Sequence, residues 1–412
     1  MSAVATWVIS AAIVGGILLR PWRSAEWQWA VAGAAALVVT GLLPLHAAAL
    51  AVYDGLDVYL FLFGMLLLAE LARAAGLFDA IAADAARRAA PSRSRLFFWT
   101  YAAGVCVTAF LSNDGTIVLL TPAVLAAGRA AQMNPLPYAF ACVLVANAAS
   151  FVLPISNPAN LVVFRTLPAL APWIRAFALP SAAAIVATAL VLYFCFSRTL
   201  RRPYPPPRSL RAPHPGAQTA AVAIGVAVLG MLAVSAVGAA LGVSAFFAAL
   251  ACAGAVGFKH RDVVREALRS GPWSIVPLVA GLFVMVAALD RSGAIAHARA
   301  LVLSAAAAAP LAGSLLAGSA AAIACNVINN LPAAVIARYS LTGAAMTPHI
   351  ARAVLIGIDL GPNFTPAGSL ASILWLMMLR RERIDVRAAQ FIAIGAAVTV
   401  PALLLALVAV IA

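Results

Sequence analysis

Two carboxyl groups lie inside long apolar stretches of the chain, where charged side chains are costly. Asp114 belongs to the polar run 112–116, and Asp359 belongs to a second polar run, 358–362. An intramembrane carboxyl group predicts a functional site, because it is tolerated only where it lines a cavity or meets a partner. Burial disfavours its charged form, so both residues are candidates for taking up and releasing the protons of a coupled transport step. The alternative is structural, with either side chain capping the start of a short helix.

Neutral amide and hydroxyl groups gather in the sequence around both carboxylates. Such groups donate and accept hydrogen bonds, so together they suit a neutral, hydroxyl-rich solute better than a strongly charged one. Some of them will only satisfy backbone groups that helix breaks leave free. The candidate solute-binding residues are Asn113, Asn147, Ser150, Ser156, Asn157, Asn329, Asn330, Thr365 and Ser369. The five cysteines are scattered without a metal-binding spacing, so we expect neither a metal site nor a bound cofactor.

Prolines and glycines interrupt the apolar runs at these same places. The breaks fall near 112–116, 146–160, 326–332 and 358–369. Proline removes a backbone donor and ends or kinks a helix. Broken helices at membrane depth are tolerated where they line a cavity, and paired breaks are typical of secondary transporters. We therefore expect discontinuous half-helices near mid-membrane that together form one solute site.

The composition indicates which class of protein positions these residues. Of the 412 residues, 65% are hydrophobic and only 10% are charged, whereas soluble domains are about 25% charged. Apolar runs close to the ~20-residue spanning length recur along the chain, which predicts an all-α polytopic membrane protein with about ten full spans. The net charge of +14 comes mostly from arginines in short loops. That distribution is typical of membrane topology and not of a nucleic-acid-binding surface.

The chain divides into two halves that resemble each other. A linker rich in proline and arginine, 198–217, separates a first transmembrane repeat, 1–197, from a second, 218–412. Long, short and broken apolar runs follow one another in the same order on both sides. Matching residues lie at nearly constant offsets, in the pairs Gly64 and Gly281, Gly76 and Gly293, Asn113 and Asn329, Asn147 and Asp359, and Pro154 and Pro366. This pattern predicts an internal duplication.

Loop charge predicts that the two repeats are inverted. Arginines concentrate in the linker and in the loops 20–27, 77–95, 259–271 and 380–387. Basic loops face the cytoplasm, and the basic loops of one half correspond to loops of the other half that carry one basic residue or none. Because the basic loops alternate between the two halves in this way, the sequence predicts inverted topology with both termini outside. Glu70 and Arg73 lie at the end of an apolar run, where pairing between helices or snorkelling is expected.

The broken segments carry motifs that resemble those of the bacterial arsenite/antimonite efflux permeases of the ion-transporter superfamily. The similarity spans most of the chain outside the linker, and its most specific part is the run 359–375. The matching segments are 112–122, 153–160, 271–273 with Gly281, 329–332 and 359–375. The resemblance implies an inner-membrane protein that exports trivalent arsenic or antimony as the neutral trihydroxide, in exchange for protons and driven by the proton gradient.

The resemblance also implies roles for individual residues and partners. Carried over to this sequence, the central site residues are Asn113, Asp114, Asn329, Asn330 and Asp359. Such permeases can act alone or with a cytosolic arsenical-stimulated ATPase. The sequence departs from the pattern at 147, which is Asn where an acidic residue is expected, and at 363, which is Asn where a basic one is expected. Because Cys325 is the only cysteine within the site motifs, thiolate ligation of arsenic is not implied.

Other activities are open from the residues alone. The same fold can exchange Na⁺ for H⁺ or carry silicic acid. A dicarboxylate is disfavoured, because the Asn and Asp set includes no arginine to bind an anion. A channel is a further alternative, which a gradient-dependence assay distinguishes from an exchanger. An enzyme is disfavoured, because the sequence contains no Walker A motif and no DDxxD or HExxH cluster.

Overall fold

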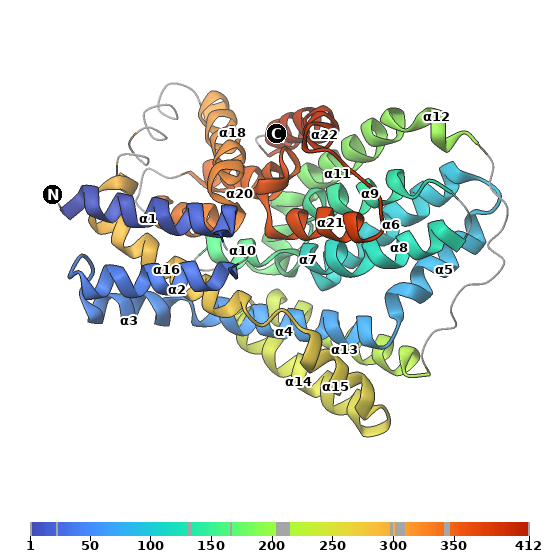
Figure 1. Ribbon diagram of the computed structural model, residues 1–412, viewed down its shortest axis with the longest axis horizontal. Coiled ribbons are helices and arrows are strands. Elements are labelled where there is room, and N and C mark those ends of the chain that lie inside the picture. The colour runs from blue at the N-terminus through green and yellow to red at the C-terminus, as the bar shows by residue number, and fades with distance from the viewer. Residues whose placement is uncertain are drawn as a thin grey trace.

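The protein is helical along its length. The computed structural model describes residues 2–21, 24–130, 133–164, 167–202, 215–296, 300, 310–341 and 347–410, and these ranges form helices, turns and short irregular segments without a β-strand (Figure 1). The prediction of an all-α membrane protein is therefore confirmed. The centre of the predicted linker, 203–214, lies outside the described residues.

The N-terminal half begins with intact helices and continues into broken ones. The first helices are α1 (Ser2–Leu19), α2 (Glu26–Val39), α3 (Leu45–Asp54), α4 (Leu56–Ala74) and α5 (Leu77–Ala89). The next elements are α6 (Arg93–Leu111), α7 (Asn113–Gly115), a π-helical turn (Thr116–Leu120), α8 (Thr121–Ala130), α9 (Leu136–Ala148), a 3₁₀ turn (Pro154–Ser156) and α10 (Pro158–Val163). The half ends with α11 (Leu170–Cys195) and α12 (Ser197–Leu200).

The C-terminal half follows a similar order. Its first helices are α13 (Ala217–Ala236), α14 (Leu241–Lys259), α15 (Arg261–Ser270) and α16 (Ile275–Arg291). The broken elements are α18 (Pro310–Ile328), α19 (Asn330–Ser340), α20 (Pro348–Leu360), two 3₁₀ turns (Gly361–Asn363 and Pro366–Gly368) and α21 (Leu370–Arg381), and the last helix is α22 (Ala388–Ala409). Breaks thus occur at all four predicted places.

Six helical segments of the described chain are long and apolar enough to cross a membrane. They are α6, α11, α13, α14, α22 and the segment that combines α15 with α16. A seventh is added if α3 and α4, which bend by 45° at Gly55, count as one span. Shorter apolar helices such as α9 surround the breaks. The chain is a multi-pass membrane protein, and the figure of about ten spans stays a prediction.

Helices of the two halves pack against each other through closely approaching glycines. α4 lies against α14, and α2 lies against α16. A Cβ atom at Gly64 of α4 would lie 2.5 Å from the backbone oxygen of Ala245, and one at Gly281 of α16 would lie 2.7 Å from that of Ala30. These two glycines form one of the pairs matched between the halves, so both members occupy a comparable contact. The duplication and its inversion stay predictions.

We expect Gly281→Ala to destabilise the protein, because the added methyl group meets the backbone of α2. Overpacking of this kind costs about 1–3 kcal/mol. Gly225→Ala is the matched control, since nothing lies within 4 Å of a Cβ atom at this exposed position of α13 and alanine favours a helix over glycine. The measurement is the melting temperature of both variants in detergent. Equal melting temperatures would show that α2 and α16 do not pack as closely as described.

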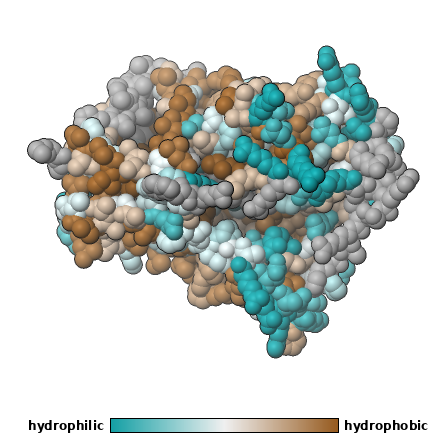
Figure 2. Space-filling view, in the orientation of Figure 1, coloured by the Kyte–Doolittle hydropathy of each residue, from teal (hydrophilic) through white to brown (hydrophobic). Residues whose placement is uncertain are grey.

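Polar residues gather toward one end of the molecule. In Figure 1 the helices α5, α12 and α15 lie toward the right-hand end, and the N-terminus and α3 lie toward the left. Hydrophilic residues on this face concentrate over α15 and toward α12 (Figure 2). α15 buries Val263 and Ala267 and exposes its arginines, as expected for a helix that lies along a surface. The positive-inside distribution predicts that this end faces the cytoplasm.

Candidate functional site

Two non-glycine residues with positive φ mark corresponding helix breaks. Ser112 (φ +86°) separates α6 from α7, and Asn329 (φ +74°) separates α18 from α19. This conformation is strained for residues with a side chain and persists only where the surroundings impose it. Each residue also caps the helix that follows, because the hydroxyl of Ser112 accepts from the Gly115 amide at 3.4 Å and Oδ1 of Asn329 accepts from the Leu331 amide at 3.5 Å.

A pocket of about 110 Å³ lies where the broken elements meet. One of its walls carries four of the predicted site residues, each from a different element. They are Asp114 in α7, Asn157 just before α10, Asn330 at the start of α19 and Ser369 just before α21. Since α19 and α21 both begin at the pocket, their free backbone amides and the positive ends of their dipoles face toward it. The pocket therefore places the carboxyl group of Asp114 among neutral amide and hydroxyl groups and helix starts.

Local capping fixes two of these side chains. Oδ1 of Asn157 accepts from the Ala159 amide at 3.0 Å, and the hydroxyl of Ser369 accepts from the Ala371 amide at 3.2 Å. In each case the side-chain oxygen accepts a hydrogen bond from the first turn of the helix that follows. The amide nitrogen of Asn157 is left free to bond another group, which is Asp359. The sequence pattern of a polar residue before a short apolar helix explains both positions.

The opposite wall of the pocket contains residues that the sequence motifs did not single out. It is mostly apolar and comes from the start of α2, from α4 and from the turn into α16. Its residues are Glu26, Trp27, Leu66, Pro272, Ser274, Ile275 and Leu278. Glu26 forms an ion pair with Arg20. Because Glu26 and Pro272 border the loops 20–27 and 259–271, the pocket lies next to segments that are predicted to be cytoplasmic.

Asp359 is fully buried behind the pocket and does not line it. Its Oδ1 accepts a hydrogen bond of 2.7 Å from Nδ2 of Asn157. Its other carboxylate oxygen, Oδ2, has no hydrogen-bond partner in the described structure. Asn157 therefore connects the pocket to Asp359, while Asp114 reaches the pocket directly. The structure brings both predicted carboxyl groups to one site and places them at different depths.

The remaining predicted residues do not line the pocket and have partners of their own. Nδ2 of Asn147 donates to Oδ1 of Asn363 at 2.8 Å, and Nδ2 of Asn363 donates to the backbone oxygen of Leu144 at 3.1 Å. Oδ1 of Asn113 accepts from the Asp114 amide at 2.9 Å. The hydroxyl of Thr365 donates to Oδ1 of Asn326 at 2.7 Å. Their predicted role in binding solute stays a prediction.

Two predicted serines have evident structural partners. The hydroxyl of Ser150 donates to the backbone oxygen of Ala146 at 2.8 Å, and that of Ser156 donates to the backbone oxygen of Ala109 at 3.2 Å. Asn326 was not among the predicted binding residues, but its Nδ2 donates to the backbone oxygens of Ala322 and Gly361. These bonds satisfy carbonyl groups at helix breaks, which is the alternative role expected for part of the amide and hydroxyl set.

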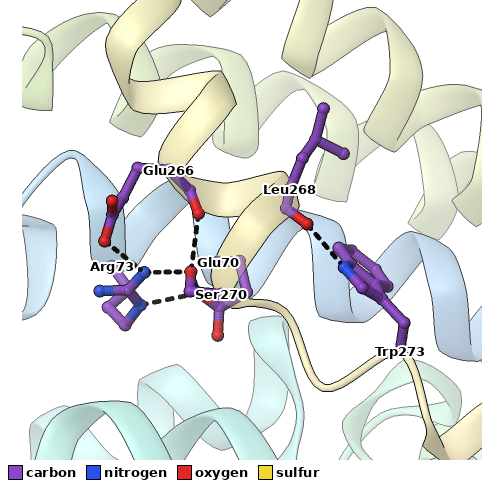
Figure 3. A network of polar contacts seen from close by, with 6 residues as sticks. All are labelled: Glu70, Arg73, Glu266, Leu268, Ser270 and Trp273. Atoms are coloured by element: carbon purple, nitrogen blue, oxygen red, sulfur yellow. Dashed lines mark hydrogen bonds and ion pairs between the residues drawn. The ribbon is translucent and has the colours of Figure 1, made fainter.

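A polar network fixes the position of the apolar wall (Figure 3). Arg73 of α4 donates through Nε to Glu70 at 2.7 Å and through Nη2 to Glu266 of α15 at 3.3 Å, and it also contacts Ser270. The hydroxyl of Ser270 lies 2.9 Å from Glu70. Glu70 and Arg73 thus pair α4 with α15, as the sequence indicated. The indole of Trp273 donates to the backbone oxygen of Leu268 at 2.8 Å, which closes the turn from α15 into α16 beside the pocket.

Comparisons of sequence and structure agree on a membrane transporter. The arsenical pump membrane protein of Escherichia coli K12 is 27% identical over 338 residues, and that of Yersinia enterocolitica is 27% identical over 334 residues, each covering 77% of both chains. The resemblance inferred from the motifs is thereby confirmed. The crystal structure of the Alcanivorax borkumensis YdaH transporter shares the fold, with a TM-score of 0.56 and 17% identity over 90% of this chain and 85% of that one.

The match to a family extends over most of the sequence. The sequence model described as CitMHS, citrate transporter, matches residues 25–357. That range contains three of the predicted residues that line the pocket, Asp114, Asn157 and Asn330, and it ends within α20, the helix that leads to Asp359. The chain therefore belongs to the citrate transporter family, CitMHS.

Proposed function

We propose that the protein is a proton-coupled secondary transporter of the bacterial inner membrane, which exports trivalent arsenic and antimony from the cytoplasm as their neutral trihydroxides. The observation that carries the proposal is the composition of the pocket. Asp114, Asn157, Asn330 and Ser369 supply one carboxyl group, two amides and one hydroxyl, and the wall that faces them is mostly apolar. The arsenical pump membrane proteins that resemble the chain support the choice of solute.

The size of the pocket fits a small solute. About 10–15 Å³ of such space holds one water molecule, so 110 Å³ accommodates a molecule of several heavy atoms. The hydroxyl groups of a trihydroxide donate to carboxylate and amide oxygens and accept from amide N–H groups. A compact triol can therefore form hydrogen bonds with several of the polar side chains that line the pocket. The apolar wall limits access of water to the other side of the solute.

The charge of the pocket argues against citrate, the solute named in the family description. The residues that line the pocket include the carboxyl groups of Asp114 and Glu26, and none of these described residues is an arginine or lysine. A tricarboxylate held in such a site would lose its hydration without gaining a cationic partner, which is strongly unfavourable. A neutral trihydroxide has no such penalty.

Proton coupling follows from the two carboxyl groups. Asp114 in its charged form accepts hydrogen bonds from solute hydroxyls, and its protonation removes part of that acceptor capacity. Asp359 acts on the same pocket through Asn157, whose Nδ2 it holds. Protonation from the outer side would then lower affinity for the solute and favour its release. Loss of the proton to the cytoplasm would restore affinity for the next cycle.

The test is uptake of arsenite into everted membrane vesicles that contain the protein. We expect uptake that depends on an imposed proton gradient and collapses when a protonophore is added. Antimonite should compete with arsenite, whereas citrate should not. Uptake of citrate, or proton movement driven by NaCl without arsenite uptake, would contradict the proposal. Vesicles without the protein provide the background.

A further inference from the structure

A second cavity, of about 280 Å³, lies at the other ends of α10 and α19, two of the helices that begin at the pocket. It is lined by Leu161 and Phe164 of the α10 segment, by Arg338 of α19, by Asp54 and Asp57 at the α3–α4 bend, and by the α13–α14 corner 238–241. None of the predicted site residues belongs to it. We call this space the outer cavity, because the α3–α4 and α13–α14 connections carry no lysine or arginine and correspond to the basic loops of the other half, which predicts that they lie outside.

The outer cavity and the pocket are separated by very little protein. Pro158 of α10 lines the pocket and Leu161 of the same helix lines the outer cavity. Three residues of helix correspond to a rise of about 4.5 Å. On α19 the corresponding residues are Leu331 and Arg338. Since α10 and α19 pack against each other, these two helices together form the barrier between the two spaces.

Arg338 ties the far end of this barrier to the surrounding helices. Its Nη2 donates to the backbone oxygen of Asp54 at 3.3 Å. Its guanidinium carbon lies 5.6 Å from the centre of the Phe283 ring in α16, within the range of a cation–π contact. α16 is also the helix that supplies Ile275 and Leu278 to the apolar wall of the pocket. One side chain therefore joins α19 to both the α3–α4 bend and α16.

On the side of the outer cavity away from Arg338, the start of α4 is joined to the start of α14. Oδ1 of Asp57 accepts from the Gly242 amide at 2.9 Å, at the start of α14. A Cβ atom at Gly242 would lie 1.9 Å from the backbone oxygen of Asp57, so the two segments are in direct contact. Arg338 holds the opposite side through a hydrogen bond of 3.3 Å and a cation–π contact. Opening between the pocket and the outer cavity therefore requires the loss of the Arg338 contacts, while the α4–α14 junction can stay intact.

We propose that the outer cavity is the exit vestibule of the transport path, and that Arg338 is the clamp that closes it while the pocket faces the cytoplasm. The vestibule would receive the neutral polyhydroxy solute and water, and protons would reach the carboxyl groups through it. The identity of the solute rests on the proposed function. The position of the vestibule and the action of Arg338 do not, because they concern access from one side of the membrane.

The experiment measures which side of the membrane a reporter cysteine reacts from. Ala240→Cys places the reporter in the outer cavity, and Ala371→Cys places it in the pocket. A charged, membrane-impermeant thiol reagent is added either to intact cells or to everted vesicles, and labelling of the chain without an added cysteine gives the background. We expect Ala240→Cys to react from outside, and Ala371→Cys to react mainly from the cytoplasmic side.

Adding Arg338→Gln should raise the labelling rate of Ala371→Cys from outside by roughly three- to tenfold, the shift expected from losing one cation–π contact and one hydrogen bond. Arg338→Lys keeps the charge but loses the planar fork and should give a smaller rise. Arg352→Gln is the matched control, since this partly buried arginine lies in α20 and does not line the outer cavity. Labelling is normalised to the amount of folded protein, which allows for a variant that assembles poorly.

Two results would overturn the proposal. Failure of Ala240→Cys to react from outside would show that the cavity does not open to that side. An unchanged outside rate for Ala371→Cys in both Arg338 variants, or an equal rise in Arg352→Gln, would show that Arg338 is not the clamp. No arsenite is needed for these measurements, so their failure is distinguishable from failure of the proposed solute.

Discussion

Asp114→Asn and Asp359→Asn are both expected to abolish proton-driven arsenite uptake, but for different reasons. Asp114 lines the pocket, so its replacement removes a charged acceptor of the solute as well as a proton carrier. Asp359 is buried behind Asn157, so its replacement removes the proton carrier alone. Asparagine keeps the acceptor oxygen for Nδ2 of Asn157, and the buried geometry is preserved.

Exchange measurements separate the two roles. With arsenite on both sides and no proton gradient, we expect Asp359→Asn to retain exchange of labelled solute, and Asp114→Asn to lose it by about tenfold or more, the loss typical of a charge-assisted hydrogen bond of 1.5–3 kcal/mol. Ser150→Ala is a suitable control, because the hydroxyl of Ser150 donates to the backbone of α9, the helix that precedes it. Full proton-driven uptake in both Asp variants would show that neither carboxyl group couples transport to protons. Equal rates of solute exchange in both variants would show that Asp114 and Asp359 do not differ in their contact with the solute.

Much of the fold could be predicted from the sequence because the membrane imposes simple rules. Apolar length fixes where helices run, and proline with glycine fixes where they break, so the breaks at Ser112 and Asn329 fall where the polar runs indicated. The four pocket residues Asp114, Asn157, Asn330 and Ser369 were all among the predicted ones. Polar residues in such places have few alternatives to lining a site or capping a helix.

Burial of individual side chains could not be predicted in the same way. The pattern that marks Asp114 also marks Asp359, yet only Asp114 reaches the pocket. Ser150 and Ser156 share the composition of the site but donate to nearby carbonyl groups. The mostly apolar wall with Glu26 and Leu66 comes from helices far away in the sequence, and no motif joins these residues to the polar runs. Tertiary packing between distant segments decides which of these side chains reach the pocket. The spacing of residues within one segment carries no information about that packing.

One sequence observation gains a physical meaning from the structure. Positions 147 and 363 both depart from the resembled pattern, where an acidic and a basic residue are expected. In the structure these two positions are in contact, with Nδ2 of Asn147 donating to Oδ1 of Asn363 at 2.8 Å. Both side chains are fully buried. A neutral amide pair therefore occupies the place where the resemblance implies opposite charges.

This contact predicts that a charged residue at position 147 is tolerated only when position 363 carries the opposite charge, and the reverse. Asn147→Glu alone places a carboxylate in a fully buried position without a cation, and Asn363→Lys alone does the same for an ammonium group. An uncompensated buried charge costs about 3–5 kcal/mol, which is enough to prevent folding of many domains. We expect each single variant to yield little folded protein. The double variant should recover, because the two introduced groups meet each other and restore the pattern expected at these positions.

The measurement is the folded yield and melting temperature of the two single variants and the double variant, analysed as a double-mutant cycle. A coupling free energy of about 2 kcal/mol or more in favour of the double variant is expected for a buried ion pair in direct contact. Asn147→Glu combined with Asn326→Lys is the matched control, since the hydrogen bonds of Asn326 go to Thr365 and to the backbone oxygens of Ala322 and Gly361, whereas Asn147 donates to Asn363. A double variant no more stable than the worse single variant would show that 147 and 363 do not meet.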